Sequence, residues 1–228
     1  MAFRLETWQG IIIALIVYGV VGYINQFVTE NTISYVMDQP PLYDRGHNVF
    51  PLVPKLYADI IVVAIVAYFI LRWGIRYPKT LENYLWIVTI LFIGRVFMFS
   101  VTQLPPPRPG CSSKKPGDPK HYRVLKKTWK ECKDLIYSGH TLHSVLVLLF
   151  VLYLAKSSLE KVVVAVAVGI ALVMIIASRI HYTVDVLLAT FVTILVFYAW
   201  PGVDKVIENI RIGGIYGVTL SQTHNLKA

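Results

Sequence analysis

Residues 162–177 read VVVAVAVGIALVMIIA, sixteen consecutive positions without a charged side chain. A run of this kind is too long for a core strand and too poor in charge for the amphipathic helix of a soluble domain. The composition of the 228-residue chain agrees, since 56% of its residues are hydrophobic and only 15% are charged, against about a quarter in ordinary soluble domains. A soluble protein with so much apolar surface would aggregate, so we expect an integral membrane protein.

Other apolar runs lie on either side of this one, and we interpret six in all as helical membrane spans. The predicted spans cover residues 10–27, 56–73, 84–101, 141–154, 162–177 and 184–200. The fourth is short for a bilayer, which needs about 20 apolar residues, so we expect its helix to extend upstream through 136–140. No small-residue cleavage pattern follows the first run, which is therefore expected to stay as a span instead of being removed as a signal peptide.

An even number of spans places both chain ends on one side of the membrane. The sequence therefore predicts an all-α integral membrane fold, a six-transmembrane-helix bundle with both termini on the same side. We expect a single domain over 1–228, with a basic loop rich in proline and glycine at 102–138 and a polar tail at 201–228. Lys and Arg residues occur on both sides, but those in the short loops favour the cytosol for the side that holds the termini.

The predicted loop 102–138 carries nine Lys and Arg residues in a chain of net charge +9. Basic segments of membrane proteins commonly meet anionic lipid headgroups, so we expect lipids as partners and no nucleic acid. The two cysteines, Cys111 and Cys132, both lie in this loop. They are either free thiols or, if the loop faces an oxidising lumen, a disulfide.

A short polar motif, Ser138-Gly139-His140-Thr141, stands directly before the fourth span. Ser-Gly is a natural break before a helix, so His140 is expected in the first helical turn. Unpaired N–H groups and the positive end of the helix dipole favour a bound phosphate at such a place. A histidine beside that phosphate can give or take a proton near neutral pH. The alternative is an interfacial histidine without a chemical role.

A second motif, HYTVD at residues 181–185, stands at the start of the sixth span. The spacing of four places His181 and Asp185 on one helix face, where the carboxylate can hold the imidazole in one tautomer. The alternative is an ion pair that caps the helix, but ionisable residues entering a membrane are costly and functional by default. The alternation of the spans brings His140 and His181 to the same membrane face.

Arg95 is an ionisable residue inside the third predicted span. A guanidinium group there needs a partner, either Asp59 in a structural pair, which we favour, or the phosphate of a substrate. We interpret His143 as a polar residue packed between helices and not as a third catalytic histidine. His47 and His121 are loop histidines without a supporting pattern.

Taken together, the motifs resemble those of the sphingomyelin synthase and inositol-phosphorylceramide synthase family, the sphingolipid synthases, within the lipid phosphate phosphatase superfamily. Four segments carry the resemblance, in the family's order: PPLYD at 40–44 resembles Pro-Pro-Leu-Pro-Asp, Arg95 with VTQLP at 101–105 is similar to the family's third-span exit, CKDLIYSGHT at 132–141 resembles Cys-Gly-Asp-x-x-x-Ser-Gly-His-Thr, and HYTVDVLLA at 181–189 resembles His-Tyr-x-x-Asp-Val-x-x-Ala. Lys133 stands where the family has glycine and Tyr43 where it has proline, which loosens the assignment to one subfamily.

This resemblance implies a two-step transfer of a phospho-headgroup between lipids. His181 would attack the phosphorus of a donor glycerophospholipid, with Asp185 orienting the ring. His140 would protonate the departing diacylglycerol and then deprotonate the primary hydroxyl of ceramide. No metal or other cofactor is implied. The further residues expected to contact substrate are Arg95, Asp44, Asp134, Ser138, Gly139, Thr141, Tyr137 and Tyr182.

The resemblance also implies a multi-pass protein of the Golgi or plasma membrane with its site on the lumenal or exoplasmic face, and a homo-oligomer is compatible with it. The headgroup stays open. Our prediction is phosphocholine, whose cation aromatic residues such as Tyr43, Tyr137 and Tyr182 would suit. Phosphoethanolamine and phosphoinositol are alternatives, and the basic loop would suit an anionic donor.

Two other functions remain as alternatives. A lipid phosphate phosphatase would use water in place of ceramide as the acceptor. Such enzymes commonly show Lys-x6-Arg-Pro and Ser-Arg-x5-His-x3-Asp, whereas here position 101 is valine and Arg179 lies only two residues before His181. A transporter or scaffold with the same helical body is disfavoured by the intact set of His140, His181 and Asp185.

Overall fold

The computed structural model describes residues 2–32, 39–107 and 135–202, and within these ranges every regular element is helical. The elements are α1 (Ala2–Thr32), α2 (Arg45–Val49), α3 (Lys55–Phe69) with a π-helical continuation (Ile70–Gly74), α4 (Pro78–Val101), α6 (Gly139–Leu154), α7 (Ser158–Ala177) and α8 (Thr183–Ala199). Each predicted span therefore coincides with a helix. The short helix α2, in the first predicted loop, was not anticipated from the sequence.

Four of the described helical segments are long and apolar enough to cross a membrane: Thr7–Thr29, Lys55–Gly74, Pro78–Val101 and Ser158–Ala177. Two further helices, Gly139–Leu154 and Thr183–Ala199, are apolar but shorter. The fourth span does extend upstream of 141, but only to Gly139 and not to 136, because Ser138 caps α6 and residues 135–138 are not helical. The Ser138 hydroxyl accepts a hydrogen bond from the Thr141 amide at 3.2 Å, which starts the helix at Gly139.

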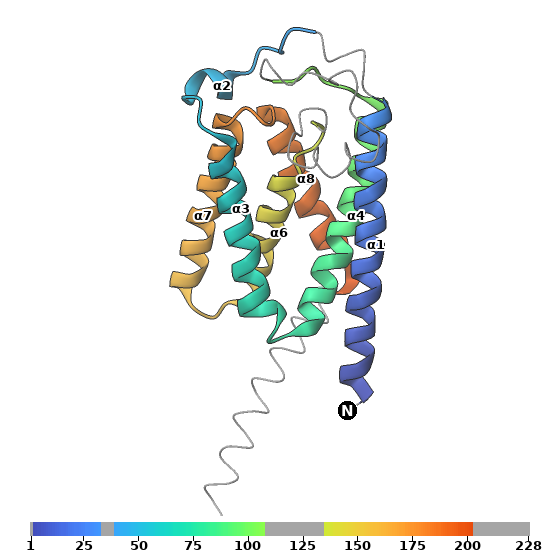
Figure 1. Cartoon of the computed structure of the whole chain (residues 1–228). Coiled ribbons are helices and arrows are strands. Elements are labelled where there is room, and N and C mark those ends of the chain that lie inside the picture. The colour runs from blue at the N-terminus through green and yellow to red at the C-terminus, as the bar shows by residue number, and fades with distance from the viewer. Residues whose placement is uncertain (1, 33–38, 108–134, 203–228) are drawn as a thin grey trace, which may run out of the picture.

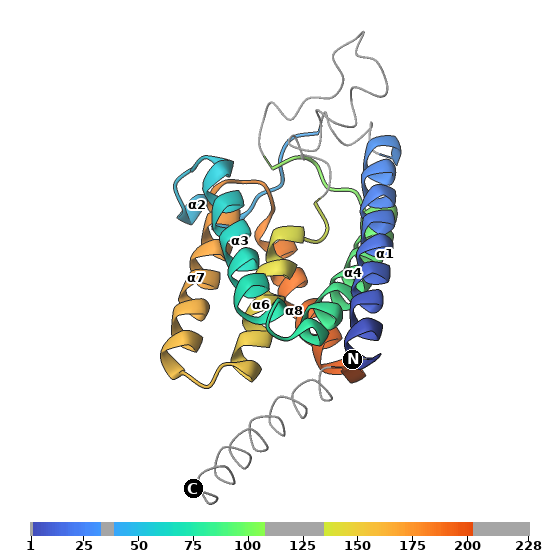
Figure 2. The same cartoon turned by 60° about the horizontal axis from the view of Figure 1, so that its bottom comes forward.

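The helices form two groups that meet along α4 and α6 (Figures 1 and 2). Helix α1 packs along α4, while α6 lies among α3, α7 and α8. A helix that is apolar all round belongs in the interior, and Leu142, Leu146 and Val151 of α6 are all fully buried. Phe150 of α6 anchors this packing, with its ring centroid 5.4 Å from that of Phe69 on α3 and 5.2 Å from that of Phe197 on α8.

Large apolar side chains also cover the outside of the bundle. Ile16 of α1, Val63 of α3 and Phe191 of α8 are each more than half exposed, and all lie mid-helix. An apolar exterior of this extent is expected of a bundle surrounded by lipid.

The ends of the bundle differ in what they carry. Helices α3, α6 and α8 all begin at one end, where α2 also lies, while the start of α1 and the end of α8 lie at the other (Figure 1). The motif residues His140 and His181 stand at the starts of α6 and α8, so the topology gathers them at the same end. We refer to this as the active end of the bundle.

Candidate active site

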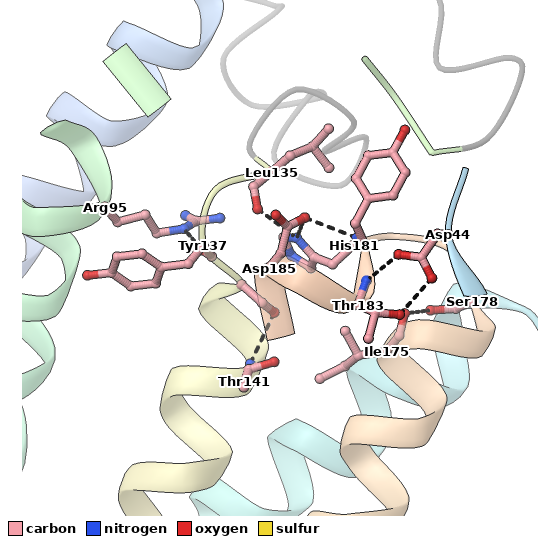
Figure 3. A network of polar contacts seen from close by, with 12 residues as sticks. Asp44, Arg95, Leu135, Tyr137, Thr141, Ile175, Ser178, His181, Thr183 and Asp185 are labelled. Atoms are coloured by element: carbon pink, nitrogen blue, oxygen red, sulfur yellow. Dashed lines mark hydrogen bonds and ion pairs between the residues drawn. The ribbon is translucent and has the colours of Figure 1, made fainter. Parts of the chain in front are cut away.

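His181 lies in the turn that joins α7 to α8, and its side chain is almost completely buried. Its Nδ1 atom is 3.2 Å from the carbonyl oxygen of Leu135 and 3.5 Å from Oδ2 of Asp185 (Figure 3). The predicted contact across the four-residue spacing is therefore present. Asp185 is held in turn, because its Oδ2 accepts a hydrogen bond from the backbone N–H of Tyr182 at 3.0 Å.

The partner at Leu135 fixes which nitrogen of His181 carries a proton. A carbonyl oxygen can only accept a hydrogen bond, so Nδ1 of His181 must be the donor. In the neutral imidazole the other nitrogen, Nε2, then holds the unshared electron pair. This is the tautomer in which Nε2 can act as a nucleophile or base, and the adjacent Asp185 carboxylate stabilises positive charge on the ring.

His140 lies in the first turn of α6, as the Ser-Gly break predicts. Its ring centroid is 6.4 Å from that of His181. A ring nitrogen acts on an atom about 3 Å away, so rings at this separation are close enough for both to approach one phosphate group. The expected meeting of the two histidines is confirmed.

Asp59 of α3 provides the partner of His140, which the sequence reasoning missed. The Oδ1 atom of Asp59 is 2.9 Å from Nε2 of His140, and its Oδ2 atom is 3.9 Å from Nζ of Lys55. Because a carboxylate only accepts, Nε2 of His140 is the protonated nitrogen. The sequence favours Asp59 as the partner of Arg95, but the described contacts of Asp59 are with His140 and Lys55.

Arg95 of α4 is buried directly beside the start of α6. Its Nε donates to the carbonyl oxygen of Tyr137 at 2.6 Å, and its Nη1 is 3.5 Å from Oδ1 of Asn25 on α1. A Cβ added to Gly139 would lie 3.6 Å from the guanidinium carbon of Arg95. The positive charge therefore lies against the N-terminus of α6, where the helix dipole already favours an anion.

The two tyrosines of the motifs are buried and bound to backbone groups. Tyr137 donates to the carbonyl oxygen of Leu91, and burial raises the pKa of its hydroxyl to about 12, so the group stays protonated. The Tyr182 hydroxyl donates to the carbonyl of Pro105 at 3.0 Å and accepts from the amide of Leu42 at 2.9 Å. Tyr137 thus ties the segment before α6 to α4, and Tyr182 ties the start of α8 to two connecting segments. Direct contact of either residue with substrate stays a prediction.

Asp44 joins the first predicted loop to the start of α8 (Figure 3). Its Oδ2 accepts from the Thr183 amide at 2.7 Å, and its Oδ1 accepts from the Thr183 hydroxyl at 2.6 Å and from the His47 amide at 3.1 Å. Burial opposes ionisation, but these hydrogen bonds outweigh it and hold the pKa of Asp44 below its ordinary value. Asp44 is therefore a carboxylate, and it holds the backbone at Thr183 beside the site.

Other predicted residues divide into three groups. Ser138 and Gly139 shape the start of α6, and the Ser138 amide also donates to the Asp185 carbonyl at 3.4 Å. Thr141 is fully buried in the same turn, and its hydroxyl has no hydrogen-bond partner among the described residues. The third group, Asp134, Cys111 and Cys132, lies outside the described residues, so the predicted contact and the predicted disulfide stay predictions.

His143 lies one turn further along α6 than His140, among side chains of α1 and α4. Its Nδ1 is 2.7 Å from the Tyr84 hydroxyl and its Nε2 is 3.4 Å from the Tyr18 hydroxyl. Both ring nitrogens thus face tyrosines of neighbouring helices. This agrees with the interpretation of His143 as a polar residue packed between helices.

Comparisons with known proteins identify the same region. Residues 131–201, which contain His140, His181 and Asp185, match the family model described as PAP2 superfamily C-terminal. A phosphatidylinositol:ceramide inositolphosphotransferase 3 of Arabidopsis thaliana is 30% identical over 184 residues, which is 70% of this chain and 63% of that relative. A phosphatidylethanolamine:ceramide ethanolaminephosphotransferase of Trypanosoma brucei brucei is 34% identical over 119 residues, or 48% of this chain and 36% of that relative.

These matches confirm the resemblance to the sphingolipid synthases within that superfamily. The chain spans less than two thirds of the length of the curated relatives that it matches.

Proposed function

We propose that this chain, a relative of ceramide phosphotransferases with a PAP2 superfamily C-terminal region, transfers a phospho-headgroup from a glycerophospholipid to the primary hydroxyl of ceramide and releases diacylglycerol. The observation that carries the proposal is the pair of imidazoles, His140 and His181, with ring centroids 6.4 Å apart and each held by a carboxylate. Two histidines held in this way supply the nucleophile and the proton carrier that phosphoryl transfer through a covalent intermediate needs.

In the first step, Nε2 of His181 attacks the phosphorus of the donor lipid. The bond between phosphorus and the glycerol oxygen breaks, and His140 gives that oxygen a proton so that diacylglycerol leaves. The headgroup phosphate is then bonded to Nε2 of His181. Asp185 and the Leu135 carbonyl keep Nδ1 of that ring protonated and stabilise the charge that it acquires.

In the second step, ceramide takes the place of diacylglycerol. His140, now neutral, accepts the proton of the ceramide hydroxyl as its oxygen attacks phosphorus, and the bond from phosphorus to His181 breaks. Asp59 stabilises the charged form of His140 at the end of this step, as it does before the first. Arg95 and the N-terminus of α6 are placed to offset the negative charge on the phosphate oxygens.

The proposal includes a membrane arrangement. All six apolar helices would cross the bilayer, the four long ones together with the two shorter ones, α6 and α8. Both termini would lie in the cytosol and the active end at the lumenal or exoplasmic face of the Golgi or plasma membrane. The position of the start of α1 and the end of α8 at one end of the bundle supports this arrangement (Figure 2).

The identity of the headgroup belongs to the same proposal. Phosphocholine remains our prediction from the sequence. Phosphoinositol and phosphoethanolamine are the alternatives, and the names of the two relatives support those alternatives. A homo-oligomer also stays a prediction.

One experiment tests both the transfer and the headgroup. The purified protein is incubated with fluorescent ceramide and, separately, with phosphatidylcholine, phosphatidylethanolamine or phosphatidylinositol, beside a His181→Ala control. A fluorescent product from one donor, absent in the control, identifies the headgroup. Release of diacylglycerol without any ceramide product would favour the hydrolase alternative, in which water is the acceptor. Unchanged activity of the control would rule out the proposed site.

A further inference from the structure

The segment 42–53, which we call the first-loop clamp, lies against the turn between α7 and α8 that carries His181. The Arg179 guanidinium donates to the carbonyl oxygen of His47 at 3.3 Å. Further hydrogen bonds join Leu42 to Tyr182, Asp44 to Thr183, and Val53 to Ala177. Two stretches about 135 residues apart in the sequence are thus joined at several points around the candidate nucleophile.

Side chains of α7 and α8 lie close against the backbone at Gly46. A Cβ at this position would lie 2.3 Å from the Thr183 hydroxyl oxygen and 2.9 Å from a methyl group of Ile176. These distances are too short for any larger residue without movement of α2. The clamp is therefore built for direct contact with the start of α8, and its position depends on glycine at 46.

His47 makes the clamp's contact with His181 itself. Its side chain is buried, and its Nε2 lies 3.0 Å from the carbonyl oxygen of His181. Its ring stacks on Tyr182 with centroids 5.5 Å apart and planes inclined by 30°. Because the carbonyl oxygen only accepts, Nε2 of His47 is the donor.

The carbonyl of His181 needs such a partner because of its place in the chain. α8 begins at Thr183, so the His181 carbonyl lies outside the helical hydrogen-bond pattern. The Tyr182 carbonyl, by contrast, already accepts from Val186 at 3.3 Å. His47 therefore holds the chain at the carbonyl of His181, and Asp44 holds it at the amide of Thr183, two positions later.

We propose that His47 is a positioning residue, whose hydrogen bond to the His181 carbonyl fixes the backbone that aims Nε2 of His181 at the donor phosphorus. This inference rests on the proposed function. Leu135 and Asp185 hold the ring of His181 at Nδ1, but the direction of Nε2 also depends on the backbone of His181. Loss of the hydrogen bond to its carbonyl therefore widens the range of orientations of the attacking nitrogen. A nucleophile misplaced by about 1 Å loses on the order of a hundredfold in rate.

Two substitutions separate the hydrogen bond from the packing of the ring. His47→Phe keeps a flat ring on Tyr182 but removes the donor, whereas His47→Gln places an amide N–H where Nε2 stands and removes the ring. Asn48→Ala, at the exposed neighbouring position, is the matched control. The measurement is the single-turnover rate of phosphohistidine formation from a radiolabelled donor lipid, together with the KM for the donor and the unfolding temperature in detergent.

The expected result is a fall of about 10- to 100-fold in the labelling rate of His47→Phe with unchanged KM and unfolding temperature. His47→Gln should recover most of the rate, and Asn48→Ala should match the wild type. Equal rates in His47→Phe and the wild type would overturn the inference. So would losses in both His47 variants that follow the unfolding temperature, since that pattern indicates packing alone. If the wild type forms no labelled enzyme, the proposed function fails first.

Discussion

The Nε2 atom of His140 on α6 lies 2.9 Å from the Oδ1 atom of Asp59 on α3. The pair joins two helices at the active end of the bundle, and both side chains are about three-quarters buried. A carboxylate in this position stabilises an imidazolium and fixes the ring's orientation. In both histidines, therefore, a carboxylate contacts one ring nitrogen and leaves the other for the proposed reaction: Asp59 contacts Nε2 of His140, and Asp185 contacts Nδ1 of His181.

Replacing Asp59 with Asn tests this relationship. The amide fills the same space but carries no charge, so the imidazolium that His140 forms in the second step loses its partner. We expect kcat for ceramide transfer to fall by about 10- to 100-fold, part of the roughly 10²–10⁴-fold that a general acid–base group contributes. The KM for the donor should not change. Steady-state assays at saturating ceramide measure both constants.

Lys55 supplies the control for Asp59. Its ammonium group is 3.9 Å from the other carboxylate oxygen, and the pair is partly exposed. Such a pair contributes about 0–1 kcal/mol, so Lys55→Met is expected to keep activity within a few-fold of the wild type. A Lys55→Met variant as impaired as Asp59→Asn would show that the charge balance of the pair matters, and not the contact with His140.

Much of this site follows from local sequence patterns. The apolar runs predict the helices because a lipid-exposed helix needs an unbroken apolar stretch. The alternation of the runs then predicts that the starts of α6 and α8 share one end, and the spacing of four predicts the contact between His181 and Asp185. Helix α6 starts at Gly139 because Ser138 caps it, although the preceding residues 135–137 are also largely apolar and could continue the span.

Two partners were beyond sequence reasoning for a physical reason. Asp59 is 81 residues from His140, and their contact depends on which helices are neighbours and on the rotation of each. His47 stands in a short helix within a loop, and its buried ring contacts Tyr182 and the His181 carbonyl, about 135 residues away in the sequence. Neither arrangement leaves a periodic signal in the sequence.

Alanine variants of His140 and His181 are expected to lose different steps of the reaction. His181→Ala removes the nucleophile and should form no phosphohistidine from any donor. His140→Ala removes only the proton carrier, so a donor whose leaving group needs no proton should restore the first step. The 4-nitrophenyl ester of the transferred headgroup is such a donor, and release of nitrophenolate is followed by absorbance. Rescue of His181→Ala, or lack of rescue of His140→Ala, would reverse or remove the assigned roles.

Asp44 should make stability depend on pH in the acidic range. Its folded pKa lies below the ordinary value of about 3.9. Its ionised form therefore stabilises the fold fully above that ordinary value, and this contribution is lost as the pH falls through the lowered, folded pKa. We expect Asp44→Asn to unfold at a lower temperature than the wild type near pH 7, with the difference shrinking below about pH 4. Thermal unfolding in detergent across pH measures it, and a difference independent of pH would contradict the account.

Arg95 offers a test of charge at the start of α6. Its guanidinium lies against Gly139 and donates to the Tyr137 carbonyl at 2.6 Å, so it combines a positive charge with a fixed geometry. Arg95→Gln removes the charge, and we expect kcat to fall by about 10²–10³-fold, as when a preorganised donor to a developing oxyanion is lost. Arg95→Lys keeps the charge without the planar guanidinium group, so its kcat should lie between those of the wild type and Arg95→Gln.

The matched control is at the opposite end of the bundle. Arg76 is exposed in the turn between Gly74 and the start of α4 at Pro78, so Arg76→Gln and Arg76→Lys should both transfer headgroups at the wild-type rate. Since Arg95 also supports Tyr137, unfolding temperatures of the Arg95 variants must accompany the rates. Loss of rate in Arg95→Gln that Arg95→Lys partly restores, at equal stability, identifies a role for the charge in the reaction. A stable Arg95→Gln variant with wild-type kcat would place the stabilisation of the phosphate on the backbone of α6 alone.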